Sequence, residues 1–486
     1  MVESQFHSRH IGARWSVRYG DYSGVSRFTV QEFQRVVQTF LPYVLPVNPD
    51  LAENVSTDGH QAWVGTAANH RGIAELLDSG SIAPPPGAQG YTVASITSPR
   101  NAEQHLLVVA GADEAGTLYG VQELARHLAA GYTGLDGDAG RRKYFDTLSD
   151  FTFSAAPAIA YRGIWTWGYV IYDYRRFLDQ MARLKMNQLV VWNDCVPVNA
   201  EELLEYAHAR GIQVIFGFHW GWGFEGNLEL LRAGDRETIR ERVLATYREQ
   251  YAGLHHDGIY FQTLTEYTTQ EIAGHSVASW AAMLVNETAQ ALLQEFPDTP
   301  IYFGLHATSI RDHYRDLVDL DPRVTITWED AGSLPYSYVP TEIDGYEETL
   351  AYSQAIASFR PDTAFSLVPK GWMTLRWFHE FENHGPFLLG ERTVDYPHDR
   401  LRARQPEWNA VNASWYRHFP LASRFYREML VCNPRLMVTG LIEDGLFENV
   451  LQPSVALFAE TLWNPHQSDA DLLARATRPS LLSELL

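Results

Sequence analysis

The chain has 486 residues, of which 45% are hydrophobic and 20% charged, a balance typical of a globular protein. Asp and Glu outnumber Lys and Arg by 59 to 38, and the formal net charge of −21 excludes the basic footprint of a nucleic-acid-binding protein. The chain is longer than one ordinary domain of ~100–200 residues, and its length suits a barrel of ~250–300 residues together with a smaller domain.

The first twenty residues are polar, with scattered Arg and His, so we expect no secretory signal there. No run in the chain approaches the ~20 apolar residues that a membrane span needs. The two cysteines, Cys195 and Cys432, could form at most one disulfide, which a chain of this size does not require. We therefore expect a cytoplasmic protein with reduced thiols and no membrane partner.

The region before residue 150 alternates apolar runs with turns rich in Pro and Gly. Its predicted strands are 61–67, 90–96 and 105–110. Apolar residues at helical spacing predict helices over 28–44 and 116–128. Residues 1–150 are therefore expected to form a small α+β domain.

From residue 161 onward, short β-rich runs alternate with helical stretches. The predicted strands are 161–167, 188–193, 213–218, 258–264, 301–306, 324–328, 364–368 and 436–441. The predicted helices are 174–185, 200–210, 228–251, 276–296, 310–317, 347–358 and 408–430. Eight such strands are the number that a closed barrel needs, and an open doubly wound sheet is the alternative. No GxGxxG or P-loop turn follows any strand, so residues 151–486 predict a (β/α)8 TIM barrel with a short helical tail and no nucleotide cofactor.

Catalysis in such barrels takes place at the C-terminal ends of the strands. The residues at these ends that we expect to bind substrate are Trp165, Trp167, Trp192, Asn193, His219, Trp220, Trp222, Gln262, His306, Trp328, Lys370, Trp372, Arg376 and Glu443. Flat aromatic rings stack on the C–H faces of sugars, and the chain has 14 Trp and 25 Tyr. Large folds also bury aromatic residues, so composition alone does not decide between the two interpretations.

Glycosidic cleavage ordinarily needs two carboxyl groups, one of which protonates the leaving oxygen. We expect Glu266 to be this acid, because it follows the buried run 259–264 and desolvation would raise its pKa. The alternative is a structural Glu.

The partner of Glu266 is Asp330 or Glu329, which are consecutive at the end of one strand. Successive strand residues point to opposite faces, so only one of them would aim inward while the strand stays extended. If the strand ends before Asp330, the alternation no longer applies, and the Asp330 side chain could act as the second carboxylate. A third possibility is the pair Glu443 and Asp444 on the last strand.

Three segments resemble known glycoside hydrolases. The segment 111–124, GADEAGTLYGVQEL, is similar to the small domain before the barrel in α-glucuronidases of family 67 and in many β-hexosaminidases. The segment 157–165, PAIAYRGIW, looks like the start of those barrels. The segment 459–465, AETLWNP, followed by SDAD at 468–471, is similar to the passage that leads into the C-terminal helices of α-glucuronidases.

The resemblance implies hydrolysis of a glycoside that contains a uronic acid or an N-acetylated sugar. Where hexosaminidases carry Asp-Glu on the fourth strand, this chain has Thr265-Glu266, which argues against an acetamido-assisted mechanism. Glu266 matches the acid of the α-glucuronidases, whereas Lys370 stands where a second carboxylate is expected. The cations available for an anionic substrate are Lys370, Arg376, Arg162 and His219.

Two other functions are compatible with the same barrel. A metal-dependent sugar isomerase or lyase could use Glu266, His306, Asp330 and Glu443 as ligands, but no tight metal-ligand spacing occurs and we expect no metal. A catalytically inactive sugar-binding barrel is the second alternative. We expect a carbohydrate as partner, no nucleic acid, and a homodimer, which is common among large barrels.

Overall fold

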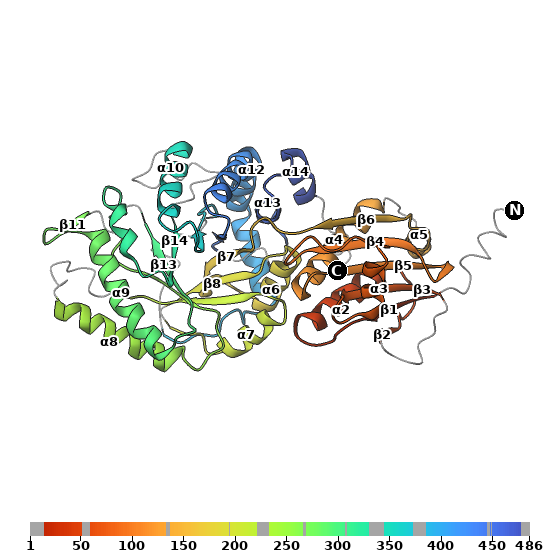
Figure 1. The fold of residues 1–486 in the computed structure, drawn as a ribbon, viewed down its shortest axis with the longest axis horizontal. Helices are drawn as coiled ribbons and strands as arrows, with labels where there is room; N and C mark the ends of the chain where they lie inside the picture. The colour runs from red at the N-terminus through yellow and green to blue at the C-terminus, as the bar shows by residue number, and fades with distance from the viewer. Residues whose placement is uncertain are drawn as a thin grey trace. The chain divides into compact units, whose positions relative to one another are not determined.

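The computed structural model describes residues 14–50, 59–132, 137–193, 195–220, 233–265, 269–306, 309–329, 345–372, 385–444, 448 and 450–477. They form two compact units (Figure 1). The first contains the described residues up to Pro157 together with His208–Gly211, and the second contains those of Ala158–Ala207 and Ile212–Thr477. The boundary lies slightly later than residue 150, because strand β6 (Phe151–Ala155) pairs with β4 (Tyr91–Ser98) and belongs to the first unit.

The first unit is built on a six-stranded sheet with the order β2-β1-β3-β5-β4-β6. Its remaining strands are β1 (Trp15–Tyr19), β2 (Val47–Pro49), β3 (His60–Thr66) and β5 (Asn101–Gly111). Strand β4 is antiparallel to both of its neighbours, and the other neighbouring strands are parallel. The unit is therefore an α+β domain, and it contains the three predicted strands together with β1, β2 and β6.

Helices cover both faces of this sheet (Figure 1). They are α2 (Gly24–Gln38), α3 (Arg71–Asp78), α4 (Glu114–Gly131) and α5 (Gly137–Asp146). Helix α3 packs on the face that carries Val108, whereas α4 lies on the opposite face, where a Cβ at Gly120 would touch Val109. Helix α2 begins at Gly24 and ends at Gln38, whereas the sequence predicted 28–44. Pro42 disfavours helical backbone at the preceding residue, so the helix could not continue to residue 44.

His70 precedes α3 and is completely buried. Its Nδ1 accepts a hydrogen bond from the backbone N–H of Ile73 at 3.2 Å and lies 3.5 Å from Oδ1 of Asp50. Burial, only partly opposed by the nearby Asp50 charge, lowers the pKa of His70 to about 4. The folded protein therefore holds a neutral imidazole at neutral pH.

His70 should make the first unit sensitive to acid. Because the unfolded side chain has a pKa near ~6.5, the unfolded state binds more protons between pH ~6.5 and 4, and about 3 kcal/mol of stability should be lost as the pH falls through this range. His70→Asn keeps a capping side chain without the titration. Urea unfolding at pH 7.5, 6 and 5 should give a flatter pH dependence for the variant, and parallel profiles would contradict this role of His70.

The second unit is a closed barrel of eight parallel strands in the order β7-β8-β9-β10-β13-β14-β15-β16. The strands are β7 (Tyr161–Trp167), β8 (Gln188–Trp192), β9 (Gln213–Gly217), β10 (Ile259–Gln262), β13 (Ile301–Leu305), β14 (Val324–Trp328), β15 (Phe365–Leu367) and β16 (Leu436–Leu441). All eight correspond to strands predicted from the sequence, and their ends agree within two residues. The prediction of a TIM barrel preceded by an α+β domain is confirmed.

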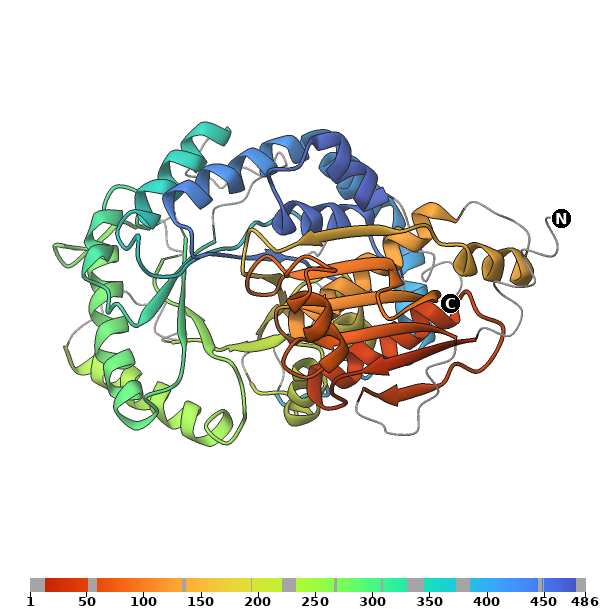
Figure 2. The same ribbon diagram turned by 45° about the vertical axis from the view of Figure 1, so that its right-hand side comes forward.

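Helices surround these strands (Figures 1 and 2). They are α6 (Tyr174–Arg183), α7 (Ala200–His208), α8 (Ala233–Gln250), α9 (Val277–Glu295), α10 (Gly345–Ala357), α12 (Asp395–Cys432), α13 (Pro453–Trp463) and α14 (Asp469–Thr477). Two short 3-10 helices are η1 (Gly168–Val170) and η3 (Tyr314–Asp319), and the strands β11 (Glu271–Ile272) and β12 (His275–Ser276) form a small hairpin before α9.

Helix α12 is longer than the predicted helix over 408–430. Its 38 residues include Pro406 and Pro420, each of which lacks the N–H that a helix interior uses. The sequence pattern therefore suggested a start after Pro406.

The hydrogen-bond register determines which strand residues share a level in the barrel. Leu441 pairs with Trp165, and the pairing continues from strand to strand until it returns to β16 at residue 433, eight residues earlier. This shift is the shear of a (β/α)8 barrel, whose inward side chains form stacked rings of four from alternate strands.

Within the described part of the chain, no helix is long and apolar enough to cross a membrane. Neither Cys195 nor Cys432, both of which lie in the described part of the chain, is bonded in a disulfide.

Candidate active site

Two consecutive rings of inward side chains lie at the C-terminal ends of the strands. The register places Trp192, Gln262, Glu329 and Leu441 in the lower ring. The ring directly above contains Trp167, His219, His306 and Lys370. Seven of these eight residues were predicted from the sequence to belong to the site, and the fold brings them together at one end of the barrel.

Glu329 is the buried carboxylate of the lower ring, with 2% of its surface exposed. Its Oε1 accepts hydrogen bonds from the Tyr260 hydroxyl and the Gln262 amide. Its Oε2 lies 3.0 Å from Nε2 of His306 and 3.3 Å from Nζ of Lys370. Lys370 Nζ is also 3.3 Å from Nδ1 of His306, so the three charged or titratable groups contact one another.

These contacts determine the charge of Glu329. Burial alone would raise its pKa, but the charges of His306 and Lys370 and the hydrogen bond from Tyr260 hold the pKa of Glu329 well below its usual range. Glu329 is therefore an ionised carboxylate at neutral pH. The Tyr260 phenol, which is buried beside this negative charge, has its pKa raised well above the usual value and stays a hydrogen-bond donor.

Gly304 makes room for this arrangement. A Cβ at Gly304 would collide with the Tyr260 hydroxyl and with Oε1 of Glu329. Any larger residue would therefore occupy the space in which the carboxylate and its donor meet.

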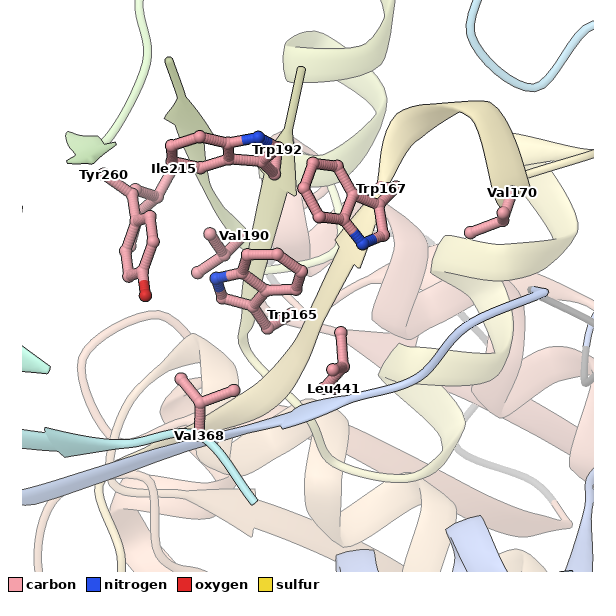
Figure 3. Close-up of a cluster of buried hydrophobic side chains, with 9 residues drawn as sticks. All are labelled: Trp165, Trp167, Val170, Val190, Trp192, Ile215, Tyr260, Val368 and Leu441. Atoms are coloured by element: carbon pink, nitrogen blue, oxygen red, sulfur yellow. The ribbon is translucent and has the colours of Figure 1, made fainter. Parts of the chain in front are cut away.

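Aromatic side chains line the opposite part of the barrel interior. Trp165, Trp167 and Trp192 belong to one buried cluster with Tyr260 (Figure 3). The Trp165 and Trp192 rings are nearly parallel at 6.3 Å, while the Tyr260 ring meets both nearly edge-on, at 5.9 and 5.8 Å. The result is an aromatic wall that continues into the ring of Glu329.

Three other tryptophans that we predicted as substrate contacts are packed elsewhere and fully buried. Trp220 stacks on Phe261 at 3.6 Å, and Trp328 packs on Tyr352 at 5.1 Å. Trp372 stacks on Trp415 of α12 at 4.5 Å. These contacts are typical of the core between the barrel and its helices.

Arg162, one of the cations considered for an anionic substrate, lies at the other end of the barrel. Its guanidinium donates to the carbonyl oxygens of Ile159 and Ala160 at 3.0 Å and lies over the ring of Trp463. It therefore belongs to the floor of the barrel.

Strand β10 ends in backbone of unusual conformation. Leu264 has a left-handed φ of 59°, which costs roughly 1–2 kcal/mol in a residue with a side chain. Thr265 accepts through its hydroxyl from the backbone N–H of His306 and through its carbonyl from that of Ser309. Backbone strain of this kind is concentrated at functional sites. The strained residue, Leu264, lies two positions before Glu266 in the chain.

Glu443 and Asp444 follow β16 and are both completely buried. The backbone N–H of Glu443 donates to the carbonyl of Trp372 at 3.4 Å. Burial raises the pKa of Asp444, and hydrogen bonds from Tyr172 and Arg400 oppose the shift.

Asn193 closes the end of β8. Its Oδ1 accepts from the backbone N–H of Gly168 at 2.9 Å, which joins the ends of β7 and β8. The buried Nδ2 has no hydrogen-bond partner among the described residues, so this amide could donate to a ligand.

Four predicted site residues, Glu266, Asp330, Trp222 and Arg376, lie outside the described residues. Their roles remain predictions. Tyr260 and Gly304 are functional candidates that the sequence analysis missed. Tyr260 could have been found by alternation, because it lies two residues before Gln262 and thus on the same face of β10.

The described residues contain no group of three or more His, Cys, Asp or Glu side chains that could hold a metal ion. The ligand set considered for an isomerase or lyase includes Glu266 and Asp330, which lie outside that search.

No protein-family model and no curated protein matches this chain. Among solved structures, a β-N-acetylhexosaminidase from Bacteroides fragilis is similar over 95% of this chain and 88% of its own, with 11% identity and a TM-score of 0.49. A GH18 chitinase from Pseudoalteromonas aurantia is similar over 62% and 99%, with 10% identity and a TM-score of 0.37. A GH5-4 endoglucanase from Clostridium acetobutylicum is similar over 60% and 89%, with 10% identity and a TM-score of 0.34. A function for this chain must therefore be drawn from its own side chains.

Proposed function

We propose that this chain is a glycoside hydrolase that cleaves a glycoside or oligosaccharide at the C-terminal end of its barrel. The observation that carries the proposal is the buried, ionised Glu329 beside an aromatic wall. Cleavage of a glycosidic bond passes through an oxocarbenium-like transition state, which carries positive charge on the sugar ring. A preorganised carboxylate in a poorly solvated site stabilises such charge more strongly than water does.

The pKa of each carboxyl group suggests its role. Glu329 keeps its negative charge and is suited to act as the nucleophile or as the charge that stabilises the transition state. It is not suited to donate a proton. We assign that role to Glu266, which follows the strained end of β10 in the chain. Tyr260 and Gln262, on the same strand, would orient the ionised carboxylate.

The finer features of the substrate are also part of the proposal. Lys370 supplies positive charge beside Glu329 and His306 supplies a ring nitrogen, and a substrate carboxylate would share these groups with it. This charge supports a uronic-acid-containing substrate, in line with the sequence resemblance to α-glucuronidases. The cytoplasmic location and the homodimer remain predictions from the sequence.

The proposal is tested by screening aryl glycosides and natural oligosaccharides, including uronides, N-acetylhexosaminides and neutral hexosides. Glu266→Gln should lose most activity on substrates with poor leaving groups and little on activated aryl glycosides, because only the former need a proton donor. Glu287→Gln, a substitution of the same type at a partly exposed position of α9, is the matched control. Unchanged cleavage of poor leaving groups by Glu266→Gln would remove Glu266 from the mechanism.

The screen also separates the two alternatives. A wild-type protein that cleaves nothing, but whose melting temperature rises with a sugar, would be a carbohydrate-binding barrel. Turnover that requires a stoichiometric divalent ion would favour the isomerase or lyase.

A further inference from the structure

Asp444 is a buried residue that the proposed mechanism does not use. It directly follows Glu443 at the end of β16, and its φ of 73° lies in the left-handed region. Such backbone in a residue with a side chain costs roughly 1–3 kcal/mol and persists only where the surroundings enforce it.

Three side chains from two distant segments bind the Asp444 carboxylate. The Tyr172 hydroxyl donates to Oδ1 at 2.5 Å, and Nε of Arg400 donates to the same oxygen at 2.8 Å. Nε of Arg404, one turn further along α12, donates to Oδ2 at 3.2 Å. We call Tyr172, Arg400 and Arg404 the Asp444 clamp. Two cations around one carboxylate favour Asp over the neutral Asn at this position.

The segment that carries Tyr172 is itself attached to the chain beyond β16. Oε1 of Glu448 accepts from the backbone N–H groups of Tyr172 at 2.7 Å and Asp173 at 2.9 Å. The loop between β7 and α6 therefore contacts the chain after β16 at two points, through Asp444 and through Glu448.

The clamp lies on the outer face of the strand, while Glu443 continues its inner face. Leu441 belongs to the inward cluster, and Glu443 follows it by two residues (Figure 3). The strand ladder persists to this point, because the N–H of Ile442 donates to Trp165 and that of Glu443 to Trp372. The register places Glu443 one ring above Lys370.

From this geometry we infer that Asp444 is a positioning residue that holds the Glu443 carboxylate on the inner face of the barrel, at the site proposed for the sugar. The inference rests on the proposed hydrolysis. The left-handed turn at Asp444 sets the direction in which the chain leaves β16, and the clamp holds that turn. Without the clamp the strained backbone would relax and the Glu443 carboxylate would leave its place.

The kinetic test compares Asp444→Ala, Glu443→Gln and the double variant with the wild type. Asp444→Ala should lower kcat about as far as Glu443→Gln, roughly ten- to hundredfold. The double variant should be no slower than Glu443→Gln alone, because the two residues would act through one carboxylate. Asp444→Asn should retain much of the activity, since Asn tolerates left-handed backbone and keeps an acceptor oxygen. If the fold-loss of kcat in the double variant equalled the product of the two single losses, the two residues would act independently and the inference would be overturned.

Lys185→Ala is the matched control for loss of stability. Lys185 is also completely buried, has a φ of 59°, and pairs with Glu460 at 3.2 Å on the opposite end of the barrel. The substitution should lower the melting temperature and leave kcat and KM unchanged. An equal loss of kcat in Lys185→Ala would show that stability, and not the aim of Glu443, explains the effect.

A second measurement requires no turnover. The titration of Glu443 is followed by carboxyl 13C NMR and assigned by its absence in Glu443→Gln. Asp444→Ala and Asp444→Asn remove the same charge, so a different Glu443 midpoint in these two variants would report geometry, and equal midpoints would overturn the inference. Failure of the wild type to cleave any glycoside would refute the proposed function but would leave this measurement decisive for Asp444.

Discussion

Replacing Glu329 by Gln is expected to lower kcat/KM on glycosides by at least about 10³-fold. The variant keeps the size of the side chain and an acceptor for the Tyr260 hydroxyl, but it removes the negative charge that faces the sugar. Tyr260→Phe keeps that charge and removes one donor, so its loss should be much smaller. Steady-state kinetics on the best substrate of the screen checks both variants. Wild-type rates in Glu329→Gln would exclude Glu329 from the reaction.

The same substitution should also reveal the charge of Glu329 through stability. Removing one member of a buried ion pair costs about 3–5 kcal/mol, since His306 and Lys370 lose their partner. Because the folded pKa lies below the unfolded value of ~4.3, the carboxylate contributes its stability above that pH and loses it as the pH falls further. The difference in unfolding free energy between wild type and variant should therefore be full at pH 7 and shrink below pH ~4. A difference that does not depend on pH would contradict an ionised Glu329.

Gly304→Ala is expected to have the second-largest effect, a loss of about 10²-fold in kcat. The new methyl group would displace the Tyr260 hydroxyl or the Glu329 carboxylate, and small displacements of a reacting group carry losses of this size. The melting temperature should fall as well, because the group is forced into a packed interior.

Gly253→Ala provides the comparison for Gly304→Ala. A Cβ at Gly253 meets nothing within 4 Å, so that variant should match the wild type in both kcat and melting temperature. If Gly304→Ala also retained wild-type kcat, close contact around Glu329 would be unimportant for turnover.

Most of the fold could be predicted from the sequence because barrel strands are buried on both sides and appear as short apolar runs. Strands β1 and β6 were missed for the complementary reason. The sequences WSVRY and FTFSA alternate apolar and polar residues, so neither forms a continuous run. The first part of α12 was also missed, because Pro406 is tolerated in the helix interior against its usual preference.

The sequence predicted which strand ends form the site, but it did not predict which of their side chains point into the barrel. Alternation along β14 separates Trp328, which packs outward, from Glu329, which faces inward, and the N–H of Glu329 still bonds to Leu305 in the ladder. The sequence left Glu329 and Asp330 as alternatives because it does not show where the extended strand stops. Alternation also fails for Trp372, because this residue lies beyond the end of β15. Its side chain packs on Trp415.

The distribution of the site over the strands has a consequence for how this protein could change over evolutionary time. Glu329 and the groups around it come from β10, β13, β14 and the end of β15, whereas the tryptophan wall comes from β7 and β8. One half of the barrel thus carries the charge and the other half shapes the space for the sugar ring. Substitutions in the tryptophan half could alter which sugar is accepted while the electrostatics of Glu329 stay intact. Sugar specificity and the catalytic charge could then evolve independently, because different strands of the same barrel carry them.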